Sequence, residues 1–286
     1  MKEFQQGAVI TNGITLHYWR SSLPAQVNTG LLSRSKQRLT LVLLHGQMEN
    51  GRCWHRVAEA LRPYYDMVIP DSRGHGLSEA PETGFGIEDR AGDTAGIIQS
   101  LQLDRPVLLG YALGAETAIG TAAIYPDLVR AVVLEDPPWP GRFYGSTPEE
   151  RGERAARWRD ELAEMKKKTR KDLLDMVREQ HPDWVEEERD PWVEAKKQVN
   201  PNITNIIFAP RRRWTDYVRE TECPILLITA DPARGATVSE QSIKEASLFM
   251  KNGRVVNIPG AGHSIHREQL EAYIKAVRNF LDKQIK

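Results

Sequence analysis

Short apolar runs alternate along this chain with segments of helical periodicity. The runs are rich in Val, Leu and Ile and occupy residues 39–44, 67–69, 106–109, 131–134, 224–229 and 255–258. Between them, apolar side chains recur at helical spacing in residues 53–61, 87–101 and 115–124. Apolar strands that alternate with helices are typical of a largely parallel sheet covered on both faces. We therefore expect an α/β fold.

The pattern changes between residues 137 and 222. Residues 149–178 are densely charged with helical periodicity, which is typical of a solvated helix face. Five tryptophans lie in the same region: Trp139, Trp158, Trp184, Trp192 and Trp214. We therefore expect one core domain, formed by residues 1–136 and 223–286, and a mainly helical cap inserted at residues 137–222.

Composition narrows the classes of partner. Lysine plus arginine equals aspartate plus glutamate, at 39 each, so no overall charge favours nucleic acid or an anionic membrane. No apolar run approaches the ~18 residues that a membrane-spanning helix needs, and the polar first residues do not resemble a signal peptide. Cys53 and Cys223 lack metal or redox spacing. We expect a soluble, cytoplasmic protein without nucleic-acid or membrane partners; its oligomeric state stays open.

The central motif is the segment 108–115, Leu-Leu-Gly-Tyr-Ala-Leu-Gly-Ala. An apolar strand runs directly into a turn that has glycines at positions 110 and 114 and then into a helix. This is the layout of a nucleophile elbow, Gly-x-Ser-x-Gly, with Ala112 where the serine belongs. The glycines are required sterically, because strand and helix meet closely there. Alone, this spacing is a weak signal.

Three further motifs stand in register with it. His45-Gly46-Gln47-Met48 follows an apolar strand, residues 71–78 read Asp-Ser-Arg-Gly-His-Gly-Leu-Ser, and Gly260-Ala261-Gly262-His263 follows the last strand. In this order the motifs resemble those of the α/β-hydrolase superfamily, over essentially the whole chain. The resemblance implies a mostly parallel eight-stranded sheet with helices on both faces and an inserted helical cap.

The resemblance also implies site residues. A serine at position 112 would attack a carbonyl carbon while His263 removes its proton. The backbone N–H groups of Gln47 and Leu113 would form the oxyanion hole. The sequence shows no phosphate loop, dinucleotide fingerprint or metal cluster, so we expect no cofactor and no metal.

The acid that orients His263 has two candidates. Asp231 follows the seventh strand, where the family commonly places this acid, but the usual carboxylate position falls on Ala233. Asp136 ends the sixth strand, at the spacing that some members use instead. Both strand ends border the same crevice. We favour Asp136 and keep Asp231 as the alternative.

Ala112 itself admits three interpretations. We favour an introduced serine-to-alanine substitution that disarms an active hydrolase, because His263, an acid and the oxyanion loop are all retained. A natural ligand-binding protein on a hydrolase scaffold is the second. An enzyme of another class on this fold, such as a lyase or a catalyst that needs no nucleophile, is the third. For an active triad, the alternative reaction is hydrolysis of a carbon–carbon bond.

The cap indicates the substrate class. Ligands of α/β proteins bind beyond the carboxyl ends of the parallel strands, where the cap should lie. We expect an apolar pocket there, and hence a small hydrophobic ester or lactone as substrate. The residues expected to line the pocket are Tyr111, Trp139, Trp184, Trp192 and Trp214.

Overall fold

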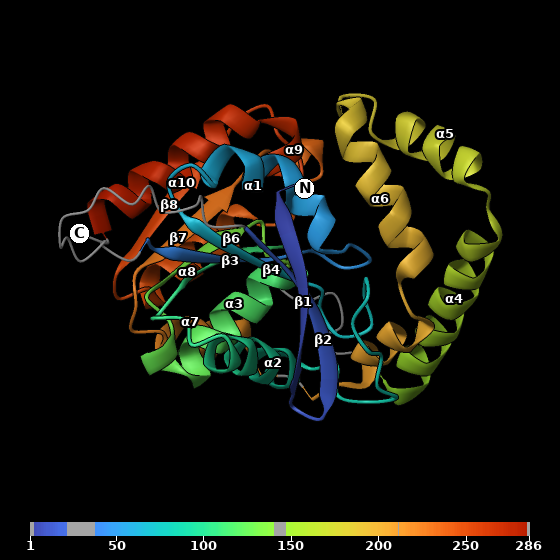
Figure 1. Ribbon diagram of the computed structural model, residues 1–286, viewed down its shortest axis with the longest axis horizontal. Helices are drawn as coiled ribbons and strands as arrows, with labels where there is room; N and C mark the ends of the chain where they lie inside the picture. The colour runs from blue at the N-terminus through green and yellow to red at the C-terminus, as the bar shows by residue number, and fades with distance from the viewer. Residues whose placement is uncertain (1–2, 22–37, 140–146, 211, 285–286) are drawn as a thin grey trace, which may run out of the picture.

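The computed structural model describes residues 3–21, 38–139, 147–210 and 212–284. Within these ranges, eight strands form one sheet in the order β1-β2-β4-β3-β5-β6-β7-β8 (Figure 1). β1 and β2 run antiparallel to each other, β2 runs antiparallel to β4, and the remaining pairs are parallel. The strands are β1 (Phe4–Thr11), β2 (Ile14–Ser21), β3 (Thr40–Leu44), β4 (Asp66–Pro70), β5 (Val107–Tyr111), β6 (Ala131–Glu135), β7 (Ile225–Thr229) and β8 (Gly253–Asn257).

Alternate side chains of the central strands pack into two separate cores. Leu41 and Leu43 of β3 lie in the core that includes residues of α1 (His55–Leu61) and α10 (Leu270–Gln284). Val42 and Leu44 lie in the opposite core, with residues of α2 (Ile87–Ser100), α3 (Leu113–Ile124), α7 (Trp214–Glu220) and α8 (Glu240–Phe249). Because both faces are covered, the central strands are apolar over most of their length, as the sequence indicated, with polar residues only at their ends, such as Thr40 and Glu135.

A helical insertion stands to one side of the sheet (Figure 1). It comprises α4 (Pro148–Lys167), α5 (Arg170–Gln180), α6 (Glu186–Gln198) and the short 3-10 helix η3 (Pro201–Phe208). Capping boxes fix the starts of α4 and α5: Thr147 caps the amide of Glu150, and Thr169 caps that of Asp172. A small apolar cluster of its own, including residues of α5 and α6, holds the insertion together.

The end of the predicted cap belongs with the core layer. α7 lies against α3 and α8, and its first residue, Trp214, stacks on Trp139 with ring centroids 4.4 Å apart. Both indoles are buried in the core on that face of the sheet. Of the expected cap, residues 137–222, the part from α4 to η3 forms the separate insertion.

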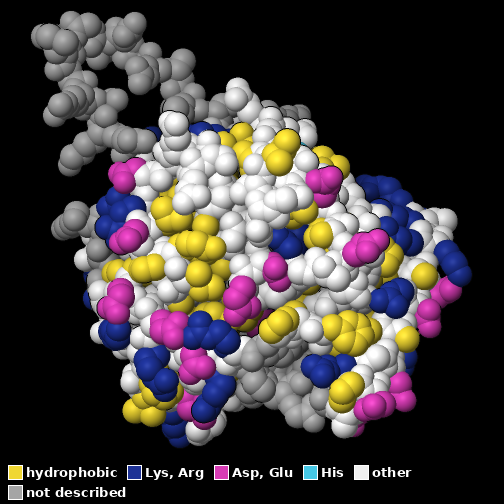
Figure 2. Space-filling model, turned by 90° about the horizontal axis from the view of Figure 1, so that it is seen from below, with side chains coloured by type: hydrophobic (Ala, Val, Ile, Leu, Met, Phe, Trp, Pro, Cys, Tyr) yellow, Lys and Arg dark blue, Asp and Glu magenta, His cyan; other side chains and the backbone are white. Residues whose placement is uncertain are grey.

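Charged side chains of both signs are interspersed over the face seen in Figure 2. On the insertion several charged side chains form ion pairs, for example Arg170 with Asp190. No helix among the described residues is both long and apolar enough to cross a membrane. The interspersed charges of both signs agree with the equal numbers of acidic and basic residues in the chain.

Candidate active site

Ala112 lies at the sharp turn between β5 and α3. Its backbone has φ 47° and ψ −110°, a conformation that costs a non-glycine residue of order 1–3 kcal/mol and that clusters at functional sites. The Ala112 N–H donates to the carbonyl oxygen of Glu135, 2.9 Å away, which fixes the turn to the end of β6. The geometry is that of a nucleophile elbow with a methyl group in place of a reactive side chain.

The two glycines of the elbow have no room for a side chain. A Cβ on Gly110 would lie 2.2 Å from the carbonyl oxygen of Gly114, and a Cβ on Gly114 would lie 2.0 Å from that of Leu44. These neighbours are backbone atoms, which cannot move aside. The expected steric requirement is therefore present at both positions.

His263 pairs with Asp136. Its Nδ1 lies 2.6 Å from Asp136 Oδ2, and the Asp136 side chain is fully buried. The carboxylate also accepts hydrogen bonds from the backbone N–H groups of Thr237 and Val238, at 2.8 and 3.0 Å. An ionised Asp136 thus receives three donors, and the proton on Nδ1 leaves Nε2 of His263 free to accept another.

Asp231 has a different neighbourhood. Its Oδ2 accepts from the backbone N–H of Gly260 at 2.7 Å, and its own N–H donates to the carbonyl oxygen of Ala261. These contacts shape the turn that carries the Gly-x-Gly-His motif. Of the two candidate acids, the structure places Asp136 against the histidine and Asp231 in this supporting turn.

Buried histidines hold the loop that carries Gln47. His45 Nδ1 donates to the carbonyl oxygen of Gly46 and its Nε2 accepts from the Ser72 N–H. His75 Nε2 accepts from the N–H of Met48 at 3.1 Å, and burial lowers the pKa of His75 to about 3, which keeps that nitrogen unprotonated. Met48 has φ 60°. The loop is fixed on both sides of Gln47.

One cavity of about 970 Å³ brings most of the predicted residues together. Gln47, Ala112, Leu113 and His263 line it, so the elbow, the histidine and both residues proposed to supply the oxyanion hole border one space. The Leu113 N–H lies in the first turn of α3, where a helix offers no internal acceptor. The predicted aromatic residues that also line this cavity are Tyr111, Trp184 and Trp192.

Trp139 and Trp214 are not among the lining residues, contrary to expectation. They stack on each other inside the core. Their large apolar surface stabilises the contact between α7 and the sheet, and periodicity alone does not separate such a position from a pocket wall. Tyr111 has a structural contact as well, since its hydroxyl lies 3.0 Å from Ser264 Oγ.

The cavity wall also holds charges that the sequence did not single out. Arg267 of α9 (Ile265–Glu268) pairs with Glu49 at 2.6 Å and with Glu188 at 3.3 Å. Burial raises the pKa of Glu49, but the charge and hydrogen bond of Arg267 outweigh it and lower that pKa to about 2. Lys196 of α6 is buried in the same wall and donates to the carbonyl oxygen of Met48 at 3.0 Å.

A second histidine–acid pair lies beneath the elbow. His266 Nδ1 lies 2.9 Å from Glu135 Oε1, and the N–H of His266 donates to the same oxygen. Both side chains are buried, and the Tyr111 ring lies beside both His263 and His266. The sequence motifs gave no sign of this pair, because neither residue belongs to one.

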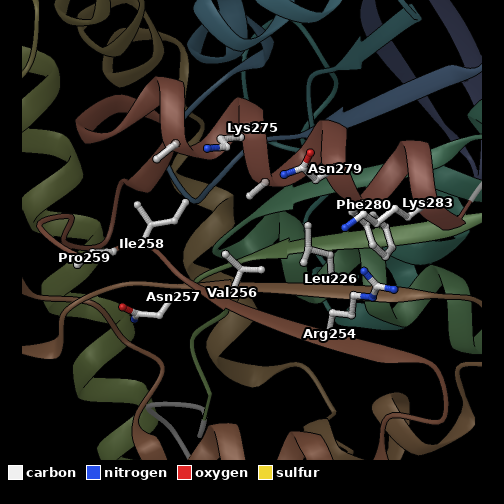
Figure 3. A pocket seen from close by; sticks show the side chains of 12 residues that line it. Leu226, Arg254, Val256, Asn257, Ile258, Pro259, Lys275, Asn279, Phe280 and Lys283 are labelled. Atoms are coloured by element: carbon white, nitrogen blue, oxygen red, sulfur yellow. The ribbon is translucent and has the colours of Figure 1, made fainter.

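A separate cavity of about 390 Å³ lies between β8 and α10 (Figure 3). Val256, Ile258 and Phe280 give it an apolar wall, and Arg254 and Lys275 add positive charge. It shares no lining residue with the cavity at Ala112.

In the described part of the chain, no group of three or more His, Cys, Asp or Glu side chains is arranged to hold a metal ion.

Comparison with known proteins agrees with the sheet and its helical insertion. Residues 41–276 match the model of the alpha/beta hydrolase family. The chain belongs to this family, and the expected α/β-hydrolase fold, with its mostly parallel eight-stranded sheet and helical insertion, is confirmed.

Relatives match over most of the chain. 2-(Acetamidomethylene)succinate hydrolase of Mesorhizobium japonicum is 28% identical over 253 residues, which are 85% of this chain and 87% of that protein. N-formylmaleamate deformylase of Pseudomonas putida is 27% identical over 96% of both chains.

Solved structures extend the likeness in three dimensions. The crystal structure of E-2-(acetamidomethylene)succinate hydrolase superposes with a TM-score of 0.75 at 24% identity, covering 98% of this chain and 99% of the other. The enol-lactonase from Burkholderia xenovorans gives a TM-score of 0.72 at 22% identity, covering 97% and 100%. At these identities the superpositions establish the shared fold.

Proposed function

We propose that this chain is a serine-type acyl hydrolase whose nucleophile has been replaced by Ala112. The observation that carries the proposal is the cavity in which the strained elbow, the Asp136–His263 pair and the loop of Gln47 meet. A binding protein without catalysis would have no need for a strained elbow aligned with a buried acid–histidine pair.

The mechanism follows from the positions of these groups. A serine at position 112 would attack the acyl carbon while His263 Nε2 takes the hydroxyl proton, with Asp136 stabilising the resulting imidazolium. The backbone N–H groups of Leu113 and Gln47 would hold the oxyanion. His263 would then protonate the leaving group, and water would release the acyl group by the same steps.

The substrate we propose is a small ester or lactone. The aromatic walls formed by Trp184 and Trp192 support an apolar substrate part. Two relatives bear the names of an acetamido-compound hydrolase and an N-formyl deformylase, so we include small N-acyl amides, which the same acyl-transfer chemistry cleaves. We place the protein in the cytoplasm and propose no nucleic-acid or membrane partner and no cofactor.

The second candidate is a natural ligand-binding protein on this scaffold, and Ala112 itself favours it. A lyase or a hydrolase of carbon–carbon bonds would use the same cavity. The hydrolase, lyase and ligand-binding proposals all use this pocket. They differ in the effect expected of a hydroxyl group at position 112.

The experiment is the restoration of that hydroxyl. Ala112→Ser should hydrolyse p-nitrophenyl acetate, a γ-lactone or an N-formyl amide at least about 10³-fold faster than the alanine protein, since triad members act as a unit. Ala112→Gly is the matched control, because glycine relieves the strained backbone without adding a nucleophile. A folded serine variant that cleaves neither these substrates nor their carboxylate-bearing analogues would refute the hydrolase proposal.

A further inference from the structure

Lys196 is a buried cation in the wall of the active-site cavity. Its side chain is 7% exposed, and its ammonium group lies 4.6 Å from the centre of the Trp192 ring. One of its three N–H donors is used by the carbonyl oxygen of Met48, the residue after Gln47. The charge therefore lies beside the loop proposed to stabilise the oxyanion.

The neighbouring carboxylates are already paired with arginines. Glu49 binds Arg267, and Glu188 binds Arg267 and Arg56. Within the described part of the chain, Lys196 forms no ion pair with a carboxylate. The charge of Glu49 acts on Lys196 without direct contact. Burying a cation that no carboxylate contacts is costly, and a cavity wall is a place where a ligand can supply that contact.

We propose that Lys196 binds a carboxylate group of the substrate, so that the enzyme acts on small acyl compounds that carry a negative charge. The proposal rests on the hydrolase site proposed above and deepens it. The carboxylate would lie near Met48 and Trp192, and the acyl carbon at Ala112. The pocket would then be apolar where Trp184 and Trp192 line it and would select for an anion at Lys196.

The electrostatics of the cavity support this assignment. Burial lowers the pKa of Lys196 to about 8, against the opposing charge of Glu49, so the side chain is mostly protonated at pH 7. The nearby groups that act on it are Glu49, Cys53 and Arg267. Lys196 in turn helps to lower the pKa values of His45, His75 and His181, after the larger effect of burial.

A pair of probes that differ in charge and by one methyl group tests the proposal on the alanine protein, without turnover. Monobenzyl glutarate carries one carboxylate, and benzyl methyl glutarate is its neutral ester. Titration by tryptophan fluorescence at pH 7 should show the carboxylate binding about tenfold or more tightly, as expected for a charge-assisted hydrogen bond. Above pH 8 this preference should weaken, because free Lys196 loses its proton.

Three variants identify the source of the preference. Lys196→Met should abolish it and leave the affinity for the neutral ester within about twofold. Lys196→Arg should keep it and extend it to pH 9.5, since arginine stays charged. Lys197→Met is the matched control, because Lys197 is the exposed neighbour on the same helix and its removal should change neither affinity.

Equal affinity for the two probes, failure of both to bind, or a preference that survives in Lys196→Met would overturn the proposal. So would a parallel loss of affinity for both probes in that variant, which would mean that Lys196 only supports the pocket wall. These binding results do not depend on position 112. An inactive Ala112→Ser protein that still prefers the carboxylate would refute the hydrolase and retain the anion site.

Discussion

Asp136 and His263 are 127 positions apart in the sequence, yet Asp136 Oδ2 lies 2.6 Å from Nδ1 of the histidine. The contact depends on how β6 ends. Glu135, its last residue, anchors Ala112 through its backbone oxygen and His266 through its carboxylate. Asp136 follows with a φ of 39°, in the left-handed region, and its carboxylate contacts His263 while that of Glu135 contacts His266. Two adjacent acids thus position the elbow and both histidines.

Replacing the acid tests this relationship. In the Ala112→Ser background, Asp136→Asn should lower kcat by about 10²–10⁴, because asparagine neither fixes the histidine tautomer nor stabilises the imidazolium. Asp231→Asn is the matched control and should change kcat by less than about threefold. Steady-state kinetics and melting temperatures of both variants provide the measurement. A larger kinetic loss from Asp231→Asn would transfer the role to that residue.

The elbow glycines should be the positions in the site where added volume is least tolerated. Gly114→Ala should lower the free energy of unfolding by more than about 3 kcal/mol or prevent folding, because its Cβ would meet the Leu44 carbonyl oxygen. A Cβ on Gly152 of α4 would meet no atom within 4 Å outside its own stretch of helix. Gly152→Ala should therefore stabilise the protein by about 0.5–1 kcal/mol through helix propensity. Urea denaturation measures both, and a well-tolerated Gly114→Ala would contradict the close approach.

The sequence predicted the sheet and its order of motifs well, because parallel strands and an elbow impose strong local patterns. It favoured Asp136 but kept Asp231 as an alternative, since both follow strands that end at the same edge and only the path of the loops separates them. Lys196 could not be distinguished from Lys197, its exposed neighbour. That difference arises when α6 packs against the loop of Met48, which is a tertiary contact.

The positions of the tryptophans also depend on tertiary contacts that the sequence pattern does not predict. Trp184 and Trp192 line the cavity, whereas Trp139 and Trp214 stack in the core. Sequence spacing placed all four in one inserted segment. Their separation requires knowing that α7 packs on α3, which no local pattern specifies.

This division predicts different responses to a bound probe. Saturation with monobenzyl glutarate should change the tryptophan emission of the protein. Replacing the three cavity tryptophans, Trp158, Trp184 and Trp192, together by Phe should remove most of that change. Trp139→Phe and Trp214→Phe should leave the change intact and lower the melting temperature instead, because each removes part of a stacked core contact. If the core pair carried the ligand response, the assignment of the pocket wall would be wrong.

The Glu49–Arg267 pair should make the stability of the protein depend on acidity. The pKa of Glu49 is lowered from 4.5 to about 2 in the folded protein. At a pH between these two values, Glu49 is therefore protonated in the unfolded chain and ionised in the folded protein. The pair contributes about 3 kcal/mol at neutral pH by this linkage, and the contribution is lost as pH falls from about 5 to about 2. Glu49→Gln should therefore be less stable than the parent at pH 7, and the difference should shrink toward pH 2. Glu161→Gln, which removes an exposed carboxylate of α4, should differ from the parent by no more than about 0.5 kcal/mol. Urea denaturation between pH 2.5 and 7 measures both, and a difference for Glu49→Gln that stayed constant across that range would refute the linkage.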